Sequence, residues 1–204
     1  MNWDMCDGTY ILMLRLIRMQ HLTDSIKKSI TNKNWYSAIA TALTIPDICS
    51  KISDGTKTTG KKYAQWFDDY VGKNYRTNYS EGQLAMVRKH STEEDYQNLL
   101  KGTKLSGNDC YALRCAFLHE GTGTISTQKA REILDEIKFL EPSFGLNLHG
   151  SIQNNKLILH IDEFSYHIID GVDKWLIQLN TEQTERLKSF LKVNDVFDFV
   201  KETK

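Results

Sequence analysis

The sequence has no excess of charge of either sign, because 26 lysine and arginine residues are balanced by 26 aspartate and glutamate residues. That balance excludes the overall positive field that strong nonspecific nucleic-acid-binding proteins usually carry, so any contact with nucleic acid must be local. Charged residues make up 25% of the chain and hydrophobic residues 40%, which argues against a disordered protein. A chain of 204 residues can bury a hydrophobic core without a metal or a disulfide.

Paired cysteines and long apolar runs are also missing. The cysteines are Cys6, Cys49, Cys110 and Cys115. They show neither a C-x-x-C pair nor the spacing of a disulfide framework, so we expect free thiols and a cytoplasmic protein. The most apolar run, residues 10–17, is interrupted by Arg15. Spanning a membrane needs about 20 apolar residues, so we expect no membrane segment and no signal peptide.

Hydrophobic residues recur at helical spacing along the first part of the chain. Steps of three and four residues predict a long first helix through Leu12, Leu16, Met19, Leu22, Ile26 and Ile30. The same spacing predicts a second helix from residue 35, which Pro46 bends or restarts, and a third helix over 63–71. Residues 54–60 are expected to form a loop, and the helical spacing is lost over 72–83.

Two Ser-x-x-acid spacings predict where later helices begin. Ser91 with Glu94, and Ser106 with Asp109, have the spacing of a capping box. The second pair begins a helix that Gly121 is expected to end. Helical spacing then predicts one more helix before the second proline, through Ala130, Ile133, Leu134 and Ile137.

The spacing changes from helical to alternating on both sides of residues 154–155, which are both asparagine. This change predicts a two-residue β-hairpin with one buried face. Counting outward from the turn places His149 opposite His160, with Asn147 beside Asp162 on the polar face. Such a face can hold a metal or sense pH, but a solvated sheet face is the interpretation that we prefer.

Helical spacing returns after the hairpin and predicts C-terminal helices, the last of them over about 181–200. The expected fold class is mainly α: a helical bundle with a small β-hairpin at about 146–162, followed by C-terminal helices. No linker or internal repeat divides the sequence. We therefore expect residues 1–204 to form a single domain, with the bundle in 1–140 and the hairpin and C-terminal helices in 145–204.

Two motifs come close to known binding sites. Residues 55–62 fit the phosphate-binding pattern G-x-x-x-x-G-K, but Lys62 stands where a serine or threonine should reach a magnesium ion. A phosphate loop also follows a buried strand, whereas the preceding segment is expected to be helical. Cys115 and His119 share a helix face, with Cys110 nearby, yet a closed zinc site needs four ligands in paired spacings. We expect a solvated basic loop and packed thiols, with no metal and no cofactor.

The segment from Arg114 to His119 is the strongest candidate for chemistry. A guanidinium can hold a phosphate through paired hydrogen bonds, and an imidazole can move protons on and off a ribose hydroxyl. Five positions on a helix are separated by about 140° round the axis, so the two side chains flank a cleft in which they can converge. The alternative is structural: His119 would interact with the free carbonyls of the helix end, and Arg114 would pair with Asp109 or Glu120.

An R-x4-6-H pattern on a helix near the end of a helical bundle resembles the HEPN (higher eukaryotes and prokaryotes nucleotide-binding) domains. The resemblance rests on Arg114 and His119 and on the general agreement of a helical first 140 residues. It implies a metal-independent endoribonuclease that works as a homodimer, with the Arg and His of both subunits meeting at the two-fold axis. Many members of that family belong to toxin–antitoxin or antiphage systems. Arg15 and His21 fit the pattern too, but only the later copy lies on a helix with a predicted cap and stop.

The sequence therefore predicts an RNA-cleaving homodimer. His119 would act as general acid or base, and Arg114 would stabilise the scissile phosphate. The alternative is a non-catalytic helical module that binds a protein partner or a nucleotide, for example as a scaffold subunit. The two predictions differ in whether Arg114 and His119 line an open surface.

Overall fold

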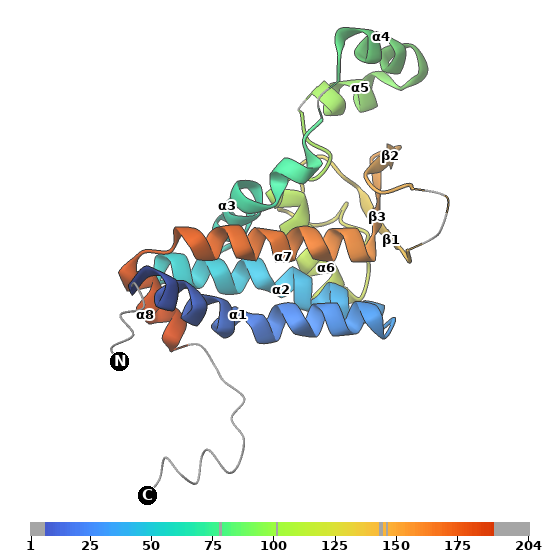
Figure 1. The fold of residues 1–204 in the computed structure, drawn as a ribbon. Helices are drawn as coiled ribbons and strands as arrows, with labels where there is room; N and C mark the ends of the chain where they lie inside the picture. The colour runs from blue at the N-terminus through green and yellow to red at the C-terminus, as the bar shows by residue number, and fades with distance from the viewer. Residues whose placement is uncertain (1–6, 78, 101, 143–144, 146, 190–204) are drawn as a thin grey trace, which may run out of the picture.

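A computed structural model of the protein describes residues 7–77, 79–100, 102–142, 145 and 147–189, with the backbone alone for residues 7–18, 94–95 and 98–99. The helices are α1 (Asp7–Thr31), α2 (Trp35–Asp54), α3 (Gly60–Tyr70), the short 3-10 helix η1 (Gly72–Tyr75), α4 (Glu81–His90), α5 (Glu93–Leu100), α6 (Gly107–Glu120), α7 (Ile161–Gln178) and α8 (Thr181–Lys188). The strands are β1 (Glu136–Leu140), β2 (Ser151–Gln153) and β3 (Lys156–His160). The fold is mainly helical with a small three-stranded sheet, which confirms the expected fold class (Figure 1).

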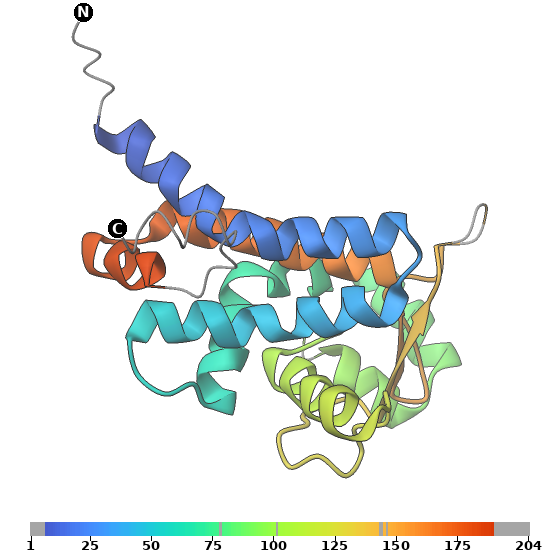
Figure 2. The ribbon, with the colours of Figure 1, turned by 90° about the horizontal axis from the view of Figure 1, so that it is seen from below.

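Helices α1, α2 and α7 lie alongside one another and form the body of the bundle (Figures 1 and 2). Their facing sides are apolar, and Ile26 of α1, Leu43 of α2 and Trp175 of α7 are almost completely buried. Helix α3 packs against α2 and α7 and also against α6. The bundle thus connects the first helices of the chain directly with the C-terminal half.

Helix α2 carries one side of the candidate site and continues through Pro46 as a single helix. Asn34 caps its N-terminus, and Gly55 ends it in the left-handed conformation at φ 77°. Pro46 therefore does not restart the helix. The burial of Pro46 among neighbouring apolar residues offsets the loss of one backbone hydrogen-bond donor.

The helix predicted over residues 130–137 is wrong. Residues 121–135 form turns, and β1 begins at Glu136. The carboxylate of Asp109 accepts hydrogen bonds from the backbone N–H groups of residues 132–134, which holds this segment in a non-helical path. Gly123 adds a second constraint, because a Cβ there would overlap the carbonyl oxygen of Ile137.

The predicted hairpin is present as the antiparallel pair β2 and β3, with Gln153 opposite Lys156. Asn154 and Asn155 both have positive φ, 51° and 56°, as a type I′ turn requires. Strand β1 adds to the other edge of β3 in parallel, so the sheet order is β1-β3-β2. The third strand was not predicted, and Leu146, the first residue of the expected alternation, lies outside the described residues.

Helices α4 and α5 form a projecting arm that stands away from the bundle (Figure 1). Helix α5 begins at Glu93, close to the Ser91 start that was predicted. Helix α4 was not predicted, although Ser80 and Gln83 make a complete capping box at its N-terminus. The base of the arm is a short antiparallel connection, in which the Thr77 N–H donates to the Gly102 carbonyl at 3.1 Å.

Asn180, the residue just before α8, caps the N-terminus of this helix and forms a capping box with Gln183. The expected continuation of this helix to about residue 200 lies outside the described residues. One hydrophobic cluster includes buried residues from the first helices, from β1 and β3 and from α7 and α8. None of the helices in the described ranges is long and apolar enough to cross a membrane.

Candidate active site

Helix α6 begins and ends where the sequence predicts. The Ser106 hydroxyl accepts a hydrogen bond from the Asp109 N–H at 3.1 Å and caps the N-terminus. Gly121 ends the helix in the left-handed conformation at φ 69°, which glycine adopts without strain. Helix α6 also crosses α3 closely, since a Cβ at Gly107 would overlap the Ala64 carbonyl. These contacts fix the helix that carries Arg114 and His119.

The side chains of Arg114 and His119 converge at the surface of the bundle. Nη1 of Arg114 lies 3.2 Å from Nε2 of His119, within hydrogen-bond distance. His119 is exposed, whereas Arg114 is half-buried. The Arg114 side chain is therefore long enough to reach His119 although the two positions point in different directions round the helix.

A carboxylate from a different helix completes this group. Nε of Arg114 donates to Oδ2 of Asp47 on α2 at 3.0 Å, and both side chains are about three-quarters buried, with exposed fractions of 24% and 23%. Asp47 is itself held, because the Thr58 hydroxyl donates to its backbone carbonyl at 3.1 Å. The sequence reasoning missed Asp47, since no local pattern connects it with a partner 67 positions away.

Burial and neighbouring charges shift the pKa values of Asp47 and Arg114. Burial raises the pKa of Asp47, and the neighbouring Arg114 opposes that rise. Burial acts to lower the pKa of Arg114, but Asp47 and Cys115 together outweigh it, so the pKa of Arg114 is raised. A guanidinium only donates hydrogen bonds, so Nε2 of His119 accepts one. A hydrogen bond in this contact therefore requires the His119 tautomer that carries its hydrogen on Nδ1.

The partners expected under the structural alternative are engaged elsewhere. Asp109 is buried and accepts backbone hydrogen bonds from the segment before β1. Glu120 accepts a hydrogen bond from the Gln128 amide at 2.9 Å. The predicted pairing of Arg114 with Asp109 or Glu120 is therefore wrong, and Asp47 takes that place.

An aromatic pair connects α6, the helix of the candidate group, with α2. Tyr36, at the start of α2, stacks on Phe117 of α6 with ring centroids 6.1 Å apart. The Tyr36 side chain is exposed at 76%, which is unusual for a large aromatic residue. The surface around α6 thus offers a cation, an imidazole and an accessible aromatic ring.

The cysteines of α6 occupy packed positions. Cys110 is buried and lies 3.6 Å from the Tyr63 hydroxyl, and burial raises the pKa of its thiol. Cys115 is half-buried, and Cys6 lies outside the described residues. Among the side chains that the structure describes, no group of three or more His, Cys, Asp or Glu residues is arranged to hold a metal ion.

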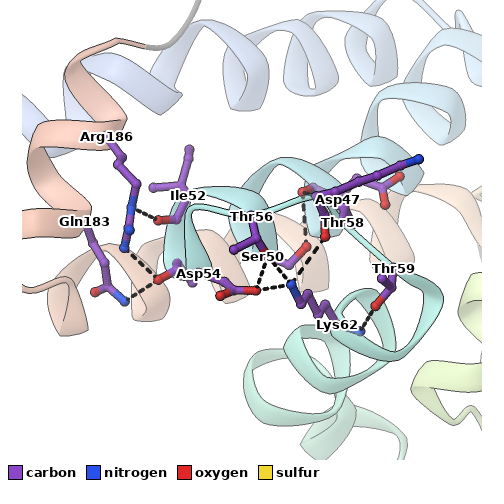
Figure 3. A network of polar contacts seen from close by, with 12 residues as sticks. Asp47, Ser50, Ile52, Asp54, Thr56, Thr58, Thr59, Lys62, Gln183 and Arg186 are labelled. Carbon is purple, nitrogen blue, oxygen red and sulfur yellow. Dashed lines mark hydrogen bonds and ion pairs between the residues drawn. The ribbon is translucent and has the colours of Figure 1, made fainter.

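The G-x-x-x-x-G-K segment folds back on itself (Figure 3). Lys62 contacts the Asp54 carboxylate and the Thr56 hydroxyl, so its ammonium is turned onto the end of α2. Thr59 caps α3 by accepting from the Lys62 N–H. The preceding element is the helix α2 rather than the strand that a phosphate loop follows.

The interpretation of the hairpin histidines as a solvated sheet face is wrong. His149 and His160 face each other as predicted, with ring centroids 6.0 Å apart, but their side chains are only 10% and 6% exposed. The His160 N–H donates to Nδ1 of His149 at 3.1 Å. His167 of α7 lies against them, and its Nδ1 is 3.1 Å from the Tyr75 hydroxyl. The sequence missed this burial because η1 comes from a distant segment and because the pattern of the hairpin does not show how α7, which follows it, folds over the cluster.

No family model, curated protein or solved structure matches this chain.

Proposed function

We propose that the protein is a HEPN-like, metal-independent endoribonuclease whose active site contains Arg114 and His119. The single observation that carries the proposal is the 3.2 Å contact between Nη1 of Arg114 and Nε2 of His119 at the surface of α6. This contact brings together a phosphate-binding cation and a proton-transfer group, the two components that RNA cleavage without a metal needs.

The state of each group suits a role in the reaction. In RNA cleavage the ribose 2′-oxygen attacks the adjacent phosphorus, the bond to the 5′-oxygen breaks, and the products are a 2′,3′-cyclic phosphate and a 5′-hydroxyl. A neutral His119 can take the proton of the 2′-hydroxyl at Nε2. Arg114 has five N–H groups, and its contacts with Asp47 and His119 leave others to bind the phosphate oxygens.

Asp47 is a positioning residue in this proposal. Its contact with Nε fixes the plane of the Arg114 guanidinium, and burial of both side chains strengthens the interaction relative to an exposed pair. The exposed ring of Tyr36 adds a surface on which an unpaired base can stack.

The second proton transfer requires an acid that protonates the leaving 5′-oxygen. A second chain related by a two-fold axis would supply another His119, so the proposal includes a homodimer. We expect analytical ultracentrifugation of the protein to give the mass of two chains. A role as a toxin or antiphage effector is a further part of the same proposal.

The ion pair with Asp47 also favours a second candidate, a non-catalytic helical module. A guanidinium neutralised by a carboxylate that is three-quarters buried can serve only to hold α6 against α2. In that case Arg114 contributes to stability, and His119 is an exposed residue without a catalytic role. A protein partner or a nucleotide would then be the ligand.

Cleavage of a mixed RNA pool in EDTA distinguishes the two candidates. We expect the parent protein to cleave and Arg114→Ala and His119→Ala to lose activity by about 100-fold or more, the usual scale for a general acid or base. The matched controls are His21→Ala, from the other copy of the R-x4-6-H pattern, and Arg131→Ala, an arginine paired with Asp135; both should keep full activity. Full activity in the two site variants, or no cleavage by the parent, would favour the non-catalytic module.

A further inference from the structure

The arm formed by α4 and α5 is joined to the bundle at a short root, which consists of residues 76–77 and 102–104 (Figure 1). The root is tied to Tyr75 of η1, because the Lys104 N–H donates to the Tyr75 carbonyl at 2.8 Å. Tyr75 is almost completely buried, and its ring stacks on Phe67 of α3 with the ring centroids 6.0 Å apart. A cavity of about 400 Å³ lies between the end of α4 and the hairpin. The arm therefore has space to move about its root if Tyr75 shifts.

Three histidines form a cluster beside Tyr75. Nδ1 of His167 lies 3.1 Å from the Tyr75 hydroxyl, and the centroid of the His149 ring lies 6.0 Å from that of the Tyr75 ring. The rings of His149 and His167 are 5.4 Å apart, and His160 lies 6.0 Å from His149. A charge that arises on this histidine cluster therefore acts directly on the residue that ties the arm to the bundle.

The folded chain has no place for a second hydrogen on His149. Its Nδ1 accepts the His160 N–H at 3.1 Å, so the neutral ring carries its hydrogen on Nε2. The Nε2 atoms of His149 and His160 are buried and have no hydrogen-bond partner among the described residues. The Glu163 carboxylate lies 3.8 Å from Nδ1 of His149, beyond hydrogen-bond distance. A protonated His149 would therefore lose the bond from His160 and gain none.

A positive charge of the arm root lies beside the cluster. Nζ of Lys104 is 3.3 Å from the position that a Cβ would take at Gly150, the residue after His149. A proton on His149 would place a second positive charge next to this ammonium, and like charges repel. The titratable and charged groups that face His149 and His167 come from η1, the arm root, β3 and α7: Tyr75, Lys104, His160, Asp162, Glu163, Asp170 and Lys174.

We propose that the histidine cluster is a pH-sensitive switch that holds the arm root closed at neutral pH and releases it in acid. In the open root the His149 imidazole reaches water, and its positive charge is separated from Lys104. The inference is independent of the proposed nuclease activity, because none of these residues belongs to the group around Arg114.

The size of the response follows from the two states of His149. Burial, followed by His160 and Lys104, lowers the pKa of His149 from 6.5 to about 4 in the closed state, and Asp162 opposes this fall. Burial also lowers the pKa of His167. If His149 regains its ordinary pKa in the open root, the equilibrium constant for opening rises about 20-fold from pH 7 to pH 5.

Native-state hydrogen exchange, followed by NMR on the whole chain, tests the switch through two amides of the root. The N–H groups of Lys104 and Thr77 are hydrogen-bonded there, to the carbonyls of Tyr75 and Gly102. We expect their protection factors, corrected for intrinsic exchange, to fall about tenfold or more from pH 7 to pH 5. A local opening exposes little surface, so this exchange should not respond to low concentrations of urea, whereas exchange through global unfolding does. No fall, or a fall with the urea dependence of global unfolding, would overturn the proposal.

Variants assign the response to the cluster. His149→Gln should abolish the fall in protection, because glutamine does not titrate. Lys104→Gln keeps His149 but removes the neighbouring ammonium, so the fall should become severalfold smaller; this variant decides the matter if His149→Gln does not fold. The matched controls are His90→Gln and Lys51→Gln, at exposed positions of α4 and α2, and both should respond as the parent does. A fall of unchanged size in His149→Gln, or in Lys104→Gln, would contradict the inference.

Discussion

His149 makes the stability of the folded protein depend on pH. Its side chain is 10% exposed, and its Nδ1 already accepts the His160 N–H, so an added proton must break that hydrogen bond. The titratable and charged groups around it come from η1, the segment before α6, β3 and α7: Tyr75, Lys104, His160, Asp162, Glu163 and His167. Burial, together with His160 and Lys104, lowers the pKa of His149 from 6.5 to about 4, and Asp162 opposes this only in part.

The direction of the effect follows from this lowered pKa. Above pH 6.5 His149 is neutral in both the folded and the unfolded chain, so its contribution to stability is complete. As the pH falls from 6.5 towards 4, the unfolded chain binds the proton first and the free energy of unfolding decreases. One pKa unit corresponds to about 1.36 kcal/mol, so the shift gives a loss of about 3 kcal/mol as an upper limit.

Urea denaturation of the parent and of His149→Gln between pH 7 and pH 4 measures this loss. Glutamine does not titrate, so the difference between the two unfolding free energies isolates His149 from the other titrating groups. We expect the parent to lose about 2 to 3 kcal/mol relative to His149→Gln over this range. His90→Gln, at an exposed position of α4, is the matched control and should give a constant difference. A constant difference for His149→Gln as well would refute the reasoning.

Three further substitutions test the packing around α6. Asp47→Asn should reduce RNA cleavage severalfold by loosening Arg114, and it should lower the urea midpoint by the equivalent of about 1 to 2 kcal/mol, because a partly buried charge loses its partner. Asp109→Ala should cost about 3 kcal/mol or more by chemical denaturation, since it leaves the N–H groups of residues 132–134, two of them buried, without their acceptor. Gly107→Ala should lower the melting temperature by several degrees, at a cost of about 1 to 3 kcal/mol, because the new Cβ would overlap the Ala64 carbonyl; an unchanged melting temperature would show that α3 and α6 can separate freely.

The sequence predicts the fold best where local signals agree. Helix α6 was predicted at both ends, because Ser106 caps it and Gly121 ends it. The hairpin was predicted from an Asn-Asn turn flanked by alternating residues. In contrast, the sequence predicts a helix over 130–137 where turns and the start of β1 lie, because the spacing of Ile133 and Ile137 fits both structures and the deciding hydrogen bonds come from Asp109, more than 20 positions earlier.

The candidate site was predicted only in part, for the same physical reason. Arg114 and His119 lie on one helix, so their spacing is visible in the sequence. Asp47 comes from another helix, and only the packing of α2 against α6 brings it to Arg114. The buried state of His149 and His160 likewise depends on η1 and α7, which a count of residues along a hairpin does not include.

The chemical structure of the RNA ends tests the central claim most directly. A defined oligoribonucleotide is incubated with the protein in EDTA, and the products are analysed by mass spectrometry. Cleavage by Arg114 and His119 predicts fragments that end in a 2′,3′-cyclic phosphate and begin with a 5′-hydroxyl, and it predicts that His119→Ala forms none of them. Intact RNA, or fragments with a 5′-phosphate, would contradict the account.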